Sequence, residues 1–509
     1  MLVSVLWRSA TVAIALALAA SAPSLAQGPA FQAEQIEINS RAAVTPFPHF
    51  WESMFGSGRA ILSLRESYRN DLRAVKAITD FKYVRFHAIL HDELGVYNED
   101  ENGNPVYNFS YVDQVYDGLL KNGVRPVVEI SFMPKKLAFN PDALHPFWYK
   151  QNVSPPKSME RWDGLMTALA KHLVERYGID EVAQWYFEVW NEPNIDFWGG
   201  IPRKESYFDL YAHTARDLKA VSPRIRVGGP ATAAAAWIPD FLKYAAENKV
   251  PVDFVSTHGY ADEPVSRLLG TNEVIAPEDR MGAVIAKVRN QIDASPLPHL
   301  PLLWTEWNVD ARKDARETPY VGPAVANMIR ECDGKVDYMS FWTFSEVFEE
   351  GGPPMAPFQH FGLRAVGGIN KPAFYGYALL HQLGTERIAN ASRNAIVTRL
   401  PDGSLAIALW NLVDPADTPR SRQITLHIRG LSPSAAASIQ RVDEKHGNVL
   451  PLYAAMGRPS SPTEAQAERL NHESAPGDPE RSALKDGTLT LDLGSNALLL
   501  VKIGGKEKR

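Results

Sequence analysis

The chain has 509 residues, of which 45% are hydrophobic and 22% are charged, and its formal net charge is −6. This length exceeds one ordinary hydrophobic core, so we expect a soluble globular protein of two domains. The small negative charge gives no reason to expect nucleic acid or an anionic membrane as a partner. Cys332 is the only cysteine, which excludes an intramolecular disulfide and a cysteine-based metal site.

Residues 1–26 have the pattern of a cleaved export signal. Arg8 supplies a positive charge, Thr11–Ala20 form an apolar run, and Ser24-Leu25-Ala26 has the small-x-small form of a cleavage site. The run is shorter than the ~20 residues that a membrane span requires. We therefore expect an exported protein, periplasmic or extracellular, with no membrane attachment after cleavage.

Residues 46–372 alternate short buried strands with segments of helical period. The strands are expected near Met54-Phe55, then at Tyr83–Phe86, Arg125–Ile130, Trp185–Val189, Arg226–Gly228, Phe254–Ser256, Leu302–Trp304 and Tyr338–Trp342. Amphipathic segments between them include Arg69–Thr79, Tyr111–Asn122, Ser158–Tyr177 and Lys204–Val221. Eight such units predict a (β/α)₈ TIM barrel, in which catalytic groups lie at the carboxyl ends of the strands.

Residues 373–509 change to short strands separated by turn residues, which predicts an accessory antiparallel β-sandwich. The strands are expected at Asn394–Arg399, Leu405–Trp410, Gln423–Ile428, Ala437–Arg441 and within Thr488–Val501. Residues 27–45 include an alternating segment and are expected to join this sandwich from the N-terminal side. Residues 455–485 predict a solvated excursion. Trp410 is the main candidate if the sandwich binds glycan, although a packing role is favoured.

Two segments place a glutamate where an apolar, aromatic strand ends. Trp185–Asn194 ends its strand on Asn191-Glu192, and Pro193 prevents the strand from continuing. Pro301–Asn308 ends likewise on Glu306, between two tryptophans. Hydrolysis of a glycosidic bond requires such a pair of carboxylates. Each glutamate alone also fits a salt bridge on a barrel rim.

The spacing of four candidates agrees with one rim of a barrel. Glu306 follows Glu192 by 114 residues (306 minus 192), which is three units of about 38 residues. His258 follows Glu192 by 66 residues (258 minus 192), and Trp342 follows Glu306 by 36 residues (342 minus 306). We therefore expect these residues at the ends of strands four, six, seven and eight.

Roles for these residues follow from their chemistry. Glu192 is expected to be the general acid/base, with a pKa raised by its aromatic surroundings. Glu306 is expected to be the ionised nucleophile, and Asn191 a donor to the sugar hydroxyl beside the reacting carbon. The alternative for Asn191 is a loop-capping role.

Further candidates follow the other strands: His87, His258, Tyr260, Trp342, Glu349 and Glu350. Tyr260 lies two residues after His258, so both can face the cleft, where Tyr260 would bond the nucleophile and His258 a sugar hydroxyl. Trp342 offers a flat surface for a pyranose ring. Structural histidines and a solvent-facing acidic loop are the alternatives. His87, His91 and His258 lack metal-ligand spacing, so we expect no metal and no cofactor.

These motifs resemble glycoside hydrolase family 39, which contains β-xylosidases and α-L-iduronidases among the (β/α)₈ retaining glycosidases. The resemblance covers roughly residues 40–385 and rests on Phe55–Gly58, Tyr83–His87, Leu94–Tyr97, Phe187–Asn194, Thr257–Tyr260, Thr305–Asn308 and Phe341–Glu350. It implies that Glu192 is the acid/base and Glu306 the nucleophile, with carboxyl groups roughly 5–5.5 Å apart. It also implies a sugar-binding set, namely His87, Asn191, His258, Tyr260, Trp342 and Glu350 or its neighbour.

The resemblance also bears on the substrate. Iduronidases have a lysine two residues past the strand-six histidine, where this chain has Tyr260, as xylosidases do. This favours a neutral sugar, namely β-D-xylose released from the non-reducing end of an oligosaccharide or polysaccharide. Arg364 stands where xylosidases tend to be apolar, and if it points inward it would bind an acidic sugar.

Two alternatives remain beside a retaining β-xylosidase. One is a hydrolase of uronic-acid or exopolysaccharide linkages, which Arg364 would serve. The other is a non-catalytic carbohydrate-binding protein on a degenerate barrel, against which the presence of both Glu192 and Glu306 argues.

Overall fold

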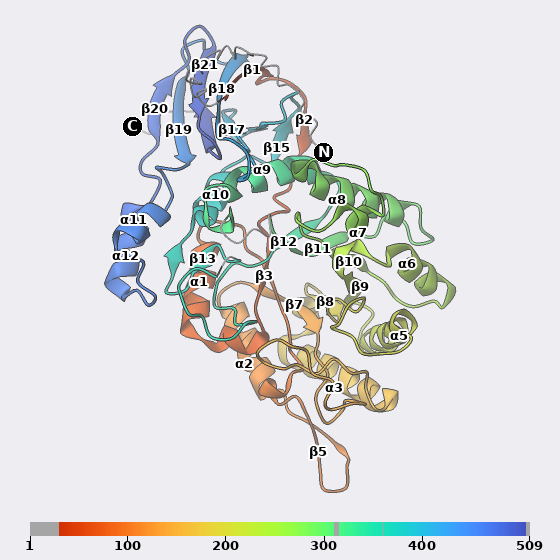
Figure 1. Cartoon of the computed structure of the whole chain (residues 1–509). Coiled ribbons are helices and arrows are strands. Elements are labelled where there is room, and N and C mark those ends of the chain that lie inside the picture. The colour runs from red at the N-terminus through yellow and green to blue at the C-terminus, as the bar shows by residue number, and fades with distance from the viewer. Residues whose placement is uncertain (1–29, 310–314, 360, 505–509) are drawn as a thin grey trace, which may run out of the picture.

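A computed structural model describes residues 30–309, 315–359 and 361–504 of the chain. The export signal expected at residues 1–26 lies outside the described residues. Figure 1 shows a barrel ringed by helices and a smaller β-structure on one side of it. Within the described ranges, no helix combines the length and the apolar character needed to cross a membrane.

Eight parallel strands close into a barrel, which confirms the predicted fold class. They are β3 (Met54–Ser57), β4 (Tyr83–Phe86), β7 (Arg125–Ile130), β8 (Tyr186–Val189), β9 (Arg226–Thr232), β10 (Phe254–His258), β11 (Leu302–Trp307) and β12 (Tyr338–Phe341). β12 pairs in parallel with β3 and so closes the ring. The fourth, sixth, seventh and eighth strands are therefore β8, β10, β11 and β12.

Helices connect the barrel strands and cover the outside of the barrel (Figure 1). They are α1 (Glu66–Lys76), α2 (Ser110–Lys121), α3 (Met159–Tyr177), α4 (Ile179–Val182), α5 (Arg203–Val221), α6 (Ile238–Glu247), α7 (Val265–Leu269), α8 (Pro277–Asp293), α9 (Val321–Cys332) and α10 (Pro372–Leu380). Two short hairpins interrupt the pattern: β5 (Tyr97–Glu99) with β6 (Pro105–Tyr107), and β13 (Arg364–Ala365) with β14 (Ile369–Asn370). Cys332 is buried at the end of α9, in the role of a packing residue.

Side chains inside the barrel lie in layers, because alternate residues of a strand face the interior. The layer nearest the amino-terminal ends of the strands is apolar and consists of Met54, Tyr83, Val127, Tyr186, Phe254 and Leu303. Arg85, Glu129 and Glu188 lie two residues further along their strands and are fully buried. The barrel therefore changes from an apolar floor to a charged layer within one step along its strands.

The accessory part consists of two sheets that pack face to face. The smaller sheet has the strand order β1 (Ala30–Asn39), β18 (Arg420–Arg429), β21 (Thr488–Leu493). The larger sheet has the strand order β2 (Val44–Pro46), β15 (Glu386–Ile388), β16 (Ala395–Arg399), β17 (Leu405–Trp410), β22 (Leu498–Ile503), β19 (Ala436–Val442), β20 (Glu480–Ala483). The N-terminal segment contributes a strand to each sheet. Contrary to the antiparallel expectation, β1 pairs with β18 in parallel. A parallel pair needs a long connection, and here the whole barrel lies between the two strands.

Strand β17 is buried on both faces and joins the two parts. Leu405, Ile407 and Leu409 pack in the core between the two sheets, whereas Ala408 and Trp410 belong to the core of the barrel. Trp410 is fully buried at this interface. Its position supports packing and does not support the glycan-binding alternative.

The boundary between the two parts lies later than residue 372. Phe374 and Tyr377 of α10 are buried in the barrel core, where the Tyr377 and Phe341 rings lie 5.6 Å apart. Helix α10 thus closes the ring of barrel helices, and the sheets of the accessory part resume at β15.

The segment 455–485 is not the solvated excursion that its composition predicts. It contains α12 (Glu464–Glu473), which follows α11 (Leu450–Ala455) and lies beside the barrel (Figure 1). Helix α12 contacts β14. Thr463 and Gln466 form a capping box at the start of α12. Ala467 and Leu470 are buried against the barrel side. Because only these two apolar residues face inward, the composition of the segment conceals the helix.

Candidate active site

A cavity of about 990 Å³ opens at the carboxyl ends of the barrel strands. The predicted site residues that line it are His87 after β4, Asn191 and Glu192 after β8, Tyr260 after β10, Glu306 in β11, and Trp342, Glu349 and Glu350 after β12. His258, the last residue of β10, is fully buried and contacts Glu192. The fold therefore brings these residues together on one rim.

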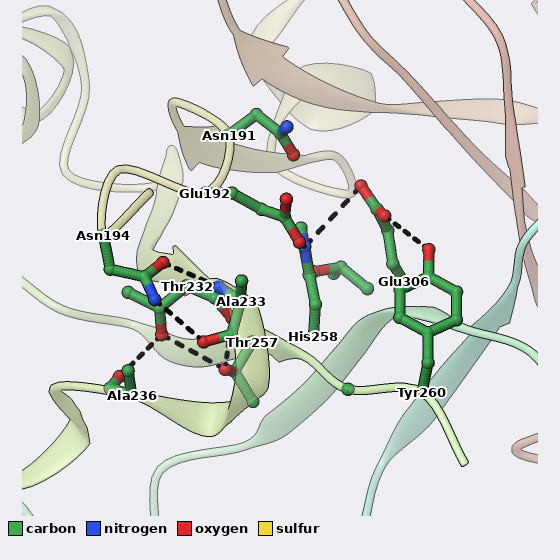
Figure 2. A network of polar contacts seen from close by, with 12 residues as sticks. Asn191, Glu192, Asn194, Thr232, Ala233, Ala236, Thr257, His258, Tyr260 and Glu306 are labelled. Carbon is green, nitrogen blue, oxygen red and sulfur yellow. Dashed lines mark hydrogen bonds and ion pairs between the residues drawn. The ribbon is translucent and has the colours of Figure 1, made fainter. Parts of the chain in front are cut away.

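Glu192 reaches the cavity from a sharply turned segment after β8. Trp190 and Glu192 have positive φ angles of 71° and 43°, a conformation that costs L residues of order 1–3 kcal/mol. The amide of Glu192 donates to the Ala231 carbonyl at 2.8 Å. Asn194 exchanges hydrogen bonds of 2.8 and 3.0 Å with Ala233 (Figure 2). These bonds tie the loop after β8 to the loop after β9 and hold the turn.

Burial raises the pKa of Glu192 to about 7, although the charges of His87 and Arg85 act against the rise. One of its oxygens lies 3.0 Å from Nδ1 of His258 (Figure 2). Burial lowers the pKa of His258 to about 4. Between these two values both groups are uncharged, so Glu192 carries a proton that it can donate as a general acid.

Both oxygens of Glu306 are held by hydrogen-bond donors. Arg85 Nη1 donates to Oε1 at 2.6 Å. The Tyr260 hydroxyl donates to Oε2 at 2.7 Å (Figure 2). A register shift between β10 and β11 places His258 opposite Glu306, although Thr257 pairs with Trp304. This carboxylate is therefore fixed in direction, as a nucleophile requires.

The two candidate carboxylates lie close together. One oxygen of Glu192, one oxygen of Glu306 and one ring nitrogen of His258 all lie within 4.8 Å of one another. Retaining glycosidases have carboxyl groups about 5–5.5 Å apart, whereas inverting enzymes need roughly 6.5–9.5 Å to accommodate a water. The observed spacing matches the retaining arrangement.

Arg85 connects the charged layer of the barrel to the cavity, although it was not among the site residues predicted from the sequence. Its guanidinium lies 2.5 Å from Glu188, 2.8 Å from Glu129 and 2.6 Å from Glu306. It also donates to Asn191 at 2.9 Å. Burial opposes the charge of Arg85, yet the three carboxylates raise its pKa. Arg85 therefore positions both the nucleophile and the amide that precedes the acid.

A signal for this network was present in the sequence. Arg85 stands two residues before His87, and Glu188 stands four residues before Glu192, each in an otherwise apolar strand. Charged residues are rarely fully buried unless they are paired. Charges at interior positions of neighbouring strands therefore indicate an ion network inside the barrel.

His87 and Trp342 form one wall of the cavity. Nδ1 of His87 lies 2.7 Å from Glu129; burial opposes its protonation, but Glu129 raises its pKa. The rings of His87 and Trp342 lie 4.8 Å apart. A Cβ at Gly56 would come within 2.3 Å of the Trp342 ring, so only glycine fits there. The indole lies where the sequence predicts a surface for a pyranose ring.

The neighbours Glu349 and Glu350 have different partners. Glu349 forms ion pairs with Arg59, at 3.1 Å, and with Arg65. Glu350 lies 3.8 Å from Nε2 of His87. Burial raises the pKa of Glu350 to about 8, with a contribution from Glu306. Glu350 is therefore the one available to a sugar, and Glu349 holds its loop to the barrel.

Arg364 does not point into the main cavity. Its Nε lies 3.0 Å from Asp71 on α1, and its guanidinium lies 5.7 Å from the ring centroid of Phe374. It lines a second cavity of about 480 Å³ beside α12. The expectation that Arg364 contacts the sugar is therefore wrong, because the β13–β14 hairpin directs it toward α1.

The chain is similar to known proteins over most of its length. Residues 34–490 match the sequence profile of glycosyl hydrolases family 39. The chain is 38% identical over 473 residues to a beta-xylosidase of Geobacillus stearothermophilus, which covers 90% of this chain and 93% of that protein. The chain is 28% identical over 232 residues to the alpha-L-iduronidase of Homo sapiens, and this match covers 44% of this chain and 33% of that protein.

A solved structure is similar over nearly the whole fold. The monomeric beta-xylosidase from Caulobacter crescentus CB15 gives a TM-score of 0.83 at 32% identity. The similarity covers 92% of this chain and 99% of that chain, so it includes the barrel and the accessory sheets.

Proposed function

The chain belongs to glycosyl hydrolases family 39 and is a retaining glycosidase, and from this premise we propose that it releases β-D-xylose from the non-reducing end of xylo-oligosaccharides. The beta-xylosidase of Geobacillus stearothermophilus matches along 90% of this chain, which supports xylose as the sugar. One observation carries the chemistry. Glu306, bound by Arg85 and Tyr260, lies within 4.8 Å of Glu192, whose raised pKa retains a proton.

Glu306 is the proposed nucleophile. Its carboxylate attacks the anomeric carbon from the face opposite the leaving group and forms a covalent glycosyl-enzyme. The hydrogen bonds from Arg85 and Tyr260 fix both oxygens before the substrate arrives. Little reorganisation of the carboxylate is then needed during the reaction.

Glu192 is the proposed acid and then the base. With a pKa of about 7 it holds a proton near neutral pH, and it gives this proton to the leaving oxygen as the bond breaks. The ionised Glu192 then takes a proton from the water that attacks the glycosyl-enzyme, which releases Glu306. His258 contacts Glu192 without adding charge, because its own pKa is about 4.

The arginines near the site are engaged with protein groups, which favours a neutral sugar. An acidic sugar needs a cation to bind its carboxylate. Arg364 is paired with Asp71 away from the main cavity. Of the described residues that line the main cavity, Arg267 pairs with Glu263 at 3.1 Å and the guanidinium of Arg316 lies 4.9 Å from an aromatic ring centroid.

A panel of nitrophenyl glycosides tests the proposed function. We expect the purified enzyme to cleave the β-D-xyloside and Glu306→Ala to lose this activity. Turnover of an α-L-iduronide without turnover of the xyloside would contradict the proposed substrate. Inactivity on every glycoside, combined with binding to xylan, would support the carbohydrate-binding alternative.

We also propose that the mature enzyme acts outside the cytoplasm, because residues 1–26 have the features of a cleaved export signal. N-terminal sequencing of the protein from the native cells is expected to begin near Gln27. An intact N-terminus would contradict export by this route.

A further inference from the structure

We propose that His49, Glu52 and His381 form a binding site for one divalent transition-metal ion, best matched to Zn²⁺, at the end of the barrel opposite the active centre. Glu52 precedes β3, and His381 directly follows α10. The sequence separates Glu52 from His381 by 329 positions, so only the fold brings the set together. The site is distinct from the proposed glycosidase centre.

The potential ligand atoms of the three side chains converge. Nδ1 of His49 lies 2.5 Å from Oε1 of Glu52, and Nδ1 of His381 lies 3.0 and 2.9 Å from the two Glu52 oxygens. All three ligand atoms lie within 4.8 Å of one another. Among the described residues, the other such group is Glu192, His258 and Glu306 in the active centre.

Two imidazoles and one carboxylate are a ligand set that suits Zn²⁺, whereas Ca²⁺ and Mg²⁺ prefer oxygen ligands. Ligand bonds of about 2.0–2.2 Å at a tetrahedral ion separate the ligand atoms by about 3.3 Å. The present separations from the Glu52 oxygens are 2.5–3.0 Å. The side chains therefore need to move apart by less than about 1 Å to admit the ion.

The burial of the three residues suits an ion with one open position. The side chain of Glu52 is fully buried, that of His49 is 12% exposed, and that of His381 is 41% exposed. His381 can therefore adjust, and it leaves an access route and a place for a water ligand.

The position of the site suggests what the ion does. The chain crosses between the accessory sheets and the barrel twice here, just after β2 and just before β15. These two strands pair with each other, and Phe47 donates to the Thr385 carbonyl at 2.8 Å. His49 lies on the first crossing and His381 on the second. An ion would therefore link both crossings and stabilise the junction of the two parts.

A proton on His381 is the competitor of the metal ion, because a charged imidazole 2.9 Å from Glu52 can balance the charge of the carboxylate by itself. Metal titration distinguishes the two. Chelator-treated full-length enzyme is titrated with Co²⁺, whose visible absorption reports nitrogen and oxygen ligands, and with Zn²⁺ in a thermal unfolding assay. We expect one equivalent bound at the junction and a melting temperature raised by roughly 5 °C at saturating Zn²⁺.

Variants assign the binding to this site. His381→Gln and His49→Gln are each expected to lose the junction equivalent and the rise in melting temperature. His172→Gln is the matched control, because His172 pairs with Asp113 at 2.6 Å and, among the residues that the structure describes, this pair belongs to no group of potential metal ligands. Glu306→Gln removes a ligand from the active-centre group and is expected to keep the junction equivalent.

Three outcomes would overturn the proposal. The first is that stripped wild-type enzyme binds no metal. The second is that a folded His381→Gln binds metal as the wild type does. The third is that the only bound equivalent disappears in Glu306→Gln and inhibits hydrolysis in the wild type, which would assign it to the active centre. Failure of the xyloside assay alone would leave the metal result unaffected.

Discussion

His258 and Glu192 form an uncharged pair beneath the cavity, with Nδ1 of His258 3.0 Å from a Glu192 oxygen. Burial keeps both side chains uncharged between pH 4 and 7, because it raises the pKa of Glu192 to about 7 and lowers the pKa of His258 to about 4. The pair thus keeps a proton on Glu192 without placing a second charge beside Glu306. The working pH range of the enzyme follows from this relationship.

The first prediction concerns the alkaline side of the pH profile. Glu192 must be protonated to act as the acid, so kcat/KM for xylobiose is expected to fall about tenfold per pH unit above about 7. A dinitrophenyl xyloside needs no proton on its leaving group, so its profile should lack this fall. Identical alkaline profiles for the two substrates would exclude Glu192 as the acid.

The second prediction separates the roles of the two glutamates. Glu306→Ala is expected to lose roughly 10⁴-fold in kcat on an aryl β-xyloside. Azide should restore turnover and yield the α-xylosyl azide, because it enters from the face that the nucleophile occupied. Glu192→Ala should instead yield the β-xylosyl azide. The anomeric configuration is measured by NMR, and Glu175→Ala, exposed on α3, is the control.

The third prediction concerns stability. Arg85→Met leaves Glu188 buried without a cationic partner and leaves Glu129 with His87 alone, so the free energy of unfolding is expected to fall by about 3–5 kcal/mol. Arg65→Met also removes an ion pair, but the Arg65 side chain is 48% exposed, and the cost should stay below about 1 kcal/mol. Urea unfolding measures both. Equal losses would contradict the central position of Arg85.

The fourth prediction compares two neighbours. Glu350→Gln is expected to lower kcat/KM by up to about tenfold near neutral pH, the effect of losing one uncharged hydrogen bond, because the pKa of Glu350 is raised to about 8. Glu349→Gln should change kcat/KM far less and lower the melting temperature, because Glu349 is paired with Arg59 and Arg65. Steady-state kinetics and thermal unfolding test the contrast. A larger loss of kcat/KM in Glu349→Gln than in Glu350→Gln would instead assign the sugar contact to Glu349.

The fifth prediction concerns Arg364, whose replacement should leave the sugar preference unchanged. Burial already raises the pKa of its partner Asp71 from 3.8 to about 6. Folded Asp71 therefore keeps a proton that the unfolded chain releases, and stability falls as pH rises from about 4 to 6. Arg364→Leu removes the positive charge that lowers the pKa of Asp71, so in this variant the loss of stability should extend to higher pH. Melting temperatures across this range measure it, and a change in the ratio of xyloside to iduronide turnover would contradict the placement.

The shared rim was predictable because it depends on period and strand order. Glu192, His258 and Glu306 each follow a short apolar run, and strand ends separated by whole strand–helix units lie at one edge of a parallel barrel. The alternation of strands and helices predicts a closed ring of strands, and closure of this ring brings the three side chains to within 4.8 Å of one another. The two catalytic candidates were therefore visible in the sequence.

Side-chain direction was less predictable, because it depends on loop conformation and distant partners. Glu349 turns away from Glu350 at a backbone with φ 62°, which no local pattern indicates. Arg364 is directed by Asp71, nearly 300 residues earlier in the chain. Helix α12 presents two apolar residues to the barrel, too few for a periodic signal.

The double-sided burial of β17 limits how this protein can be divided. With Trp410 in the barrel core and Ile407 in the core between the sheets, a chain cut between the two parts would leave a wide apolar surface in water on each piece. Neither piece could then be exchanged freely with that of a distant relative. The barrel and its sheets are consequently expected to be inherited, and to be engineered, as one unit.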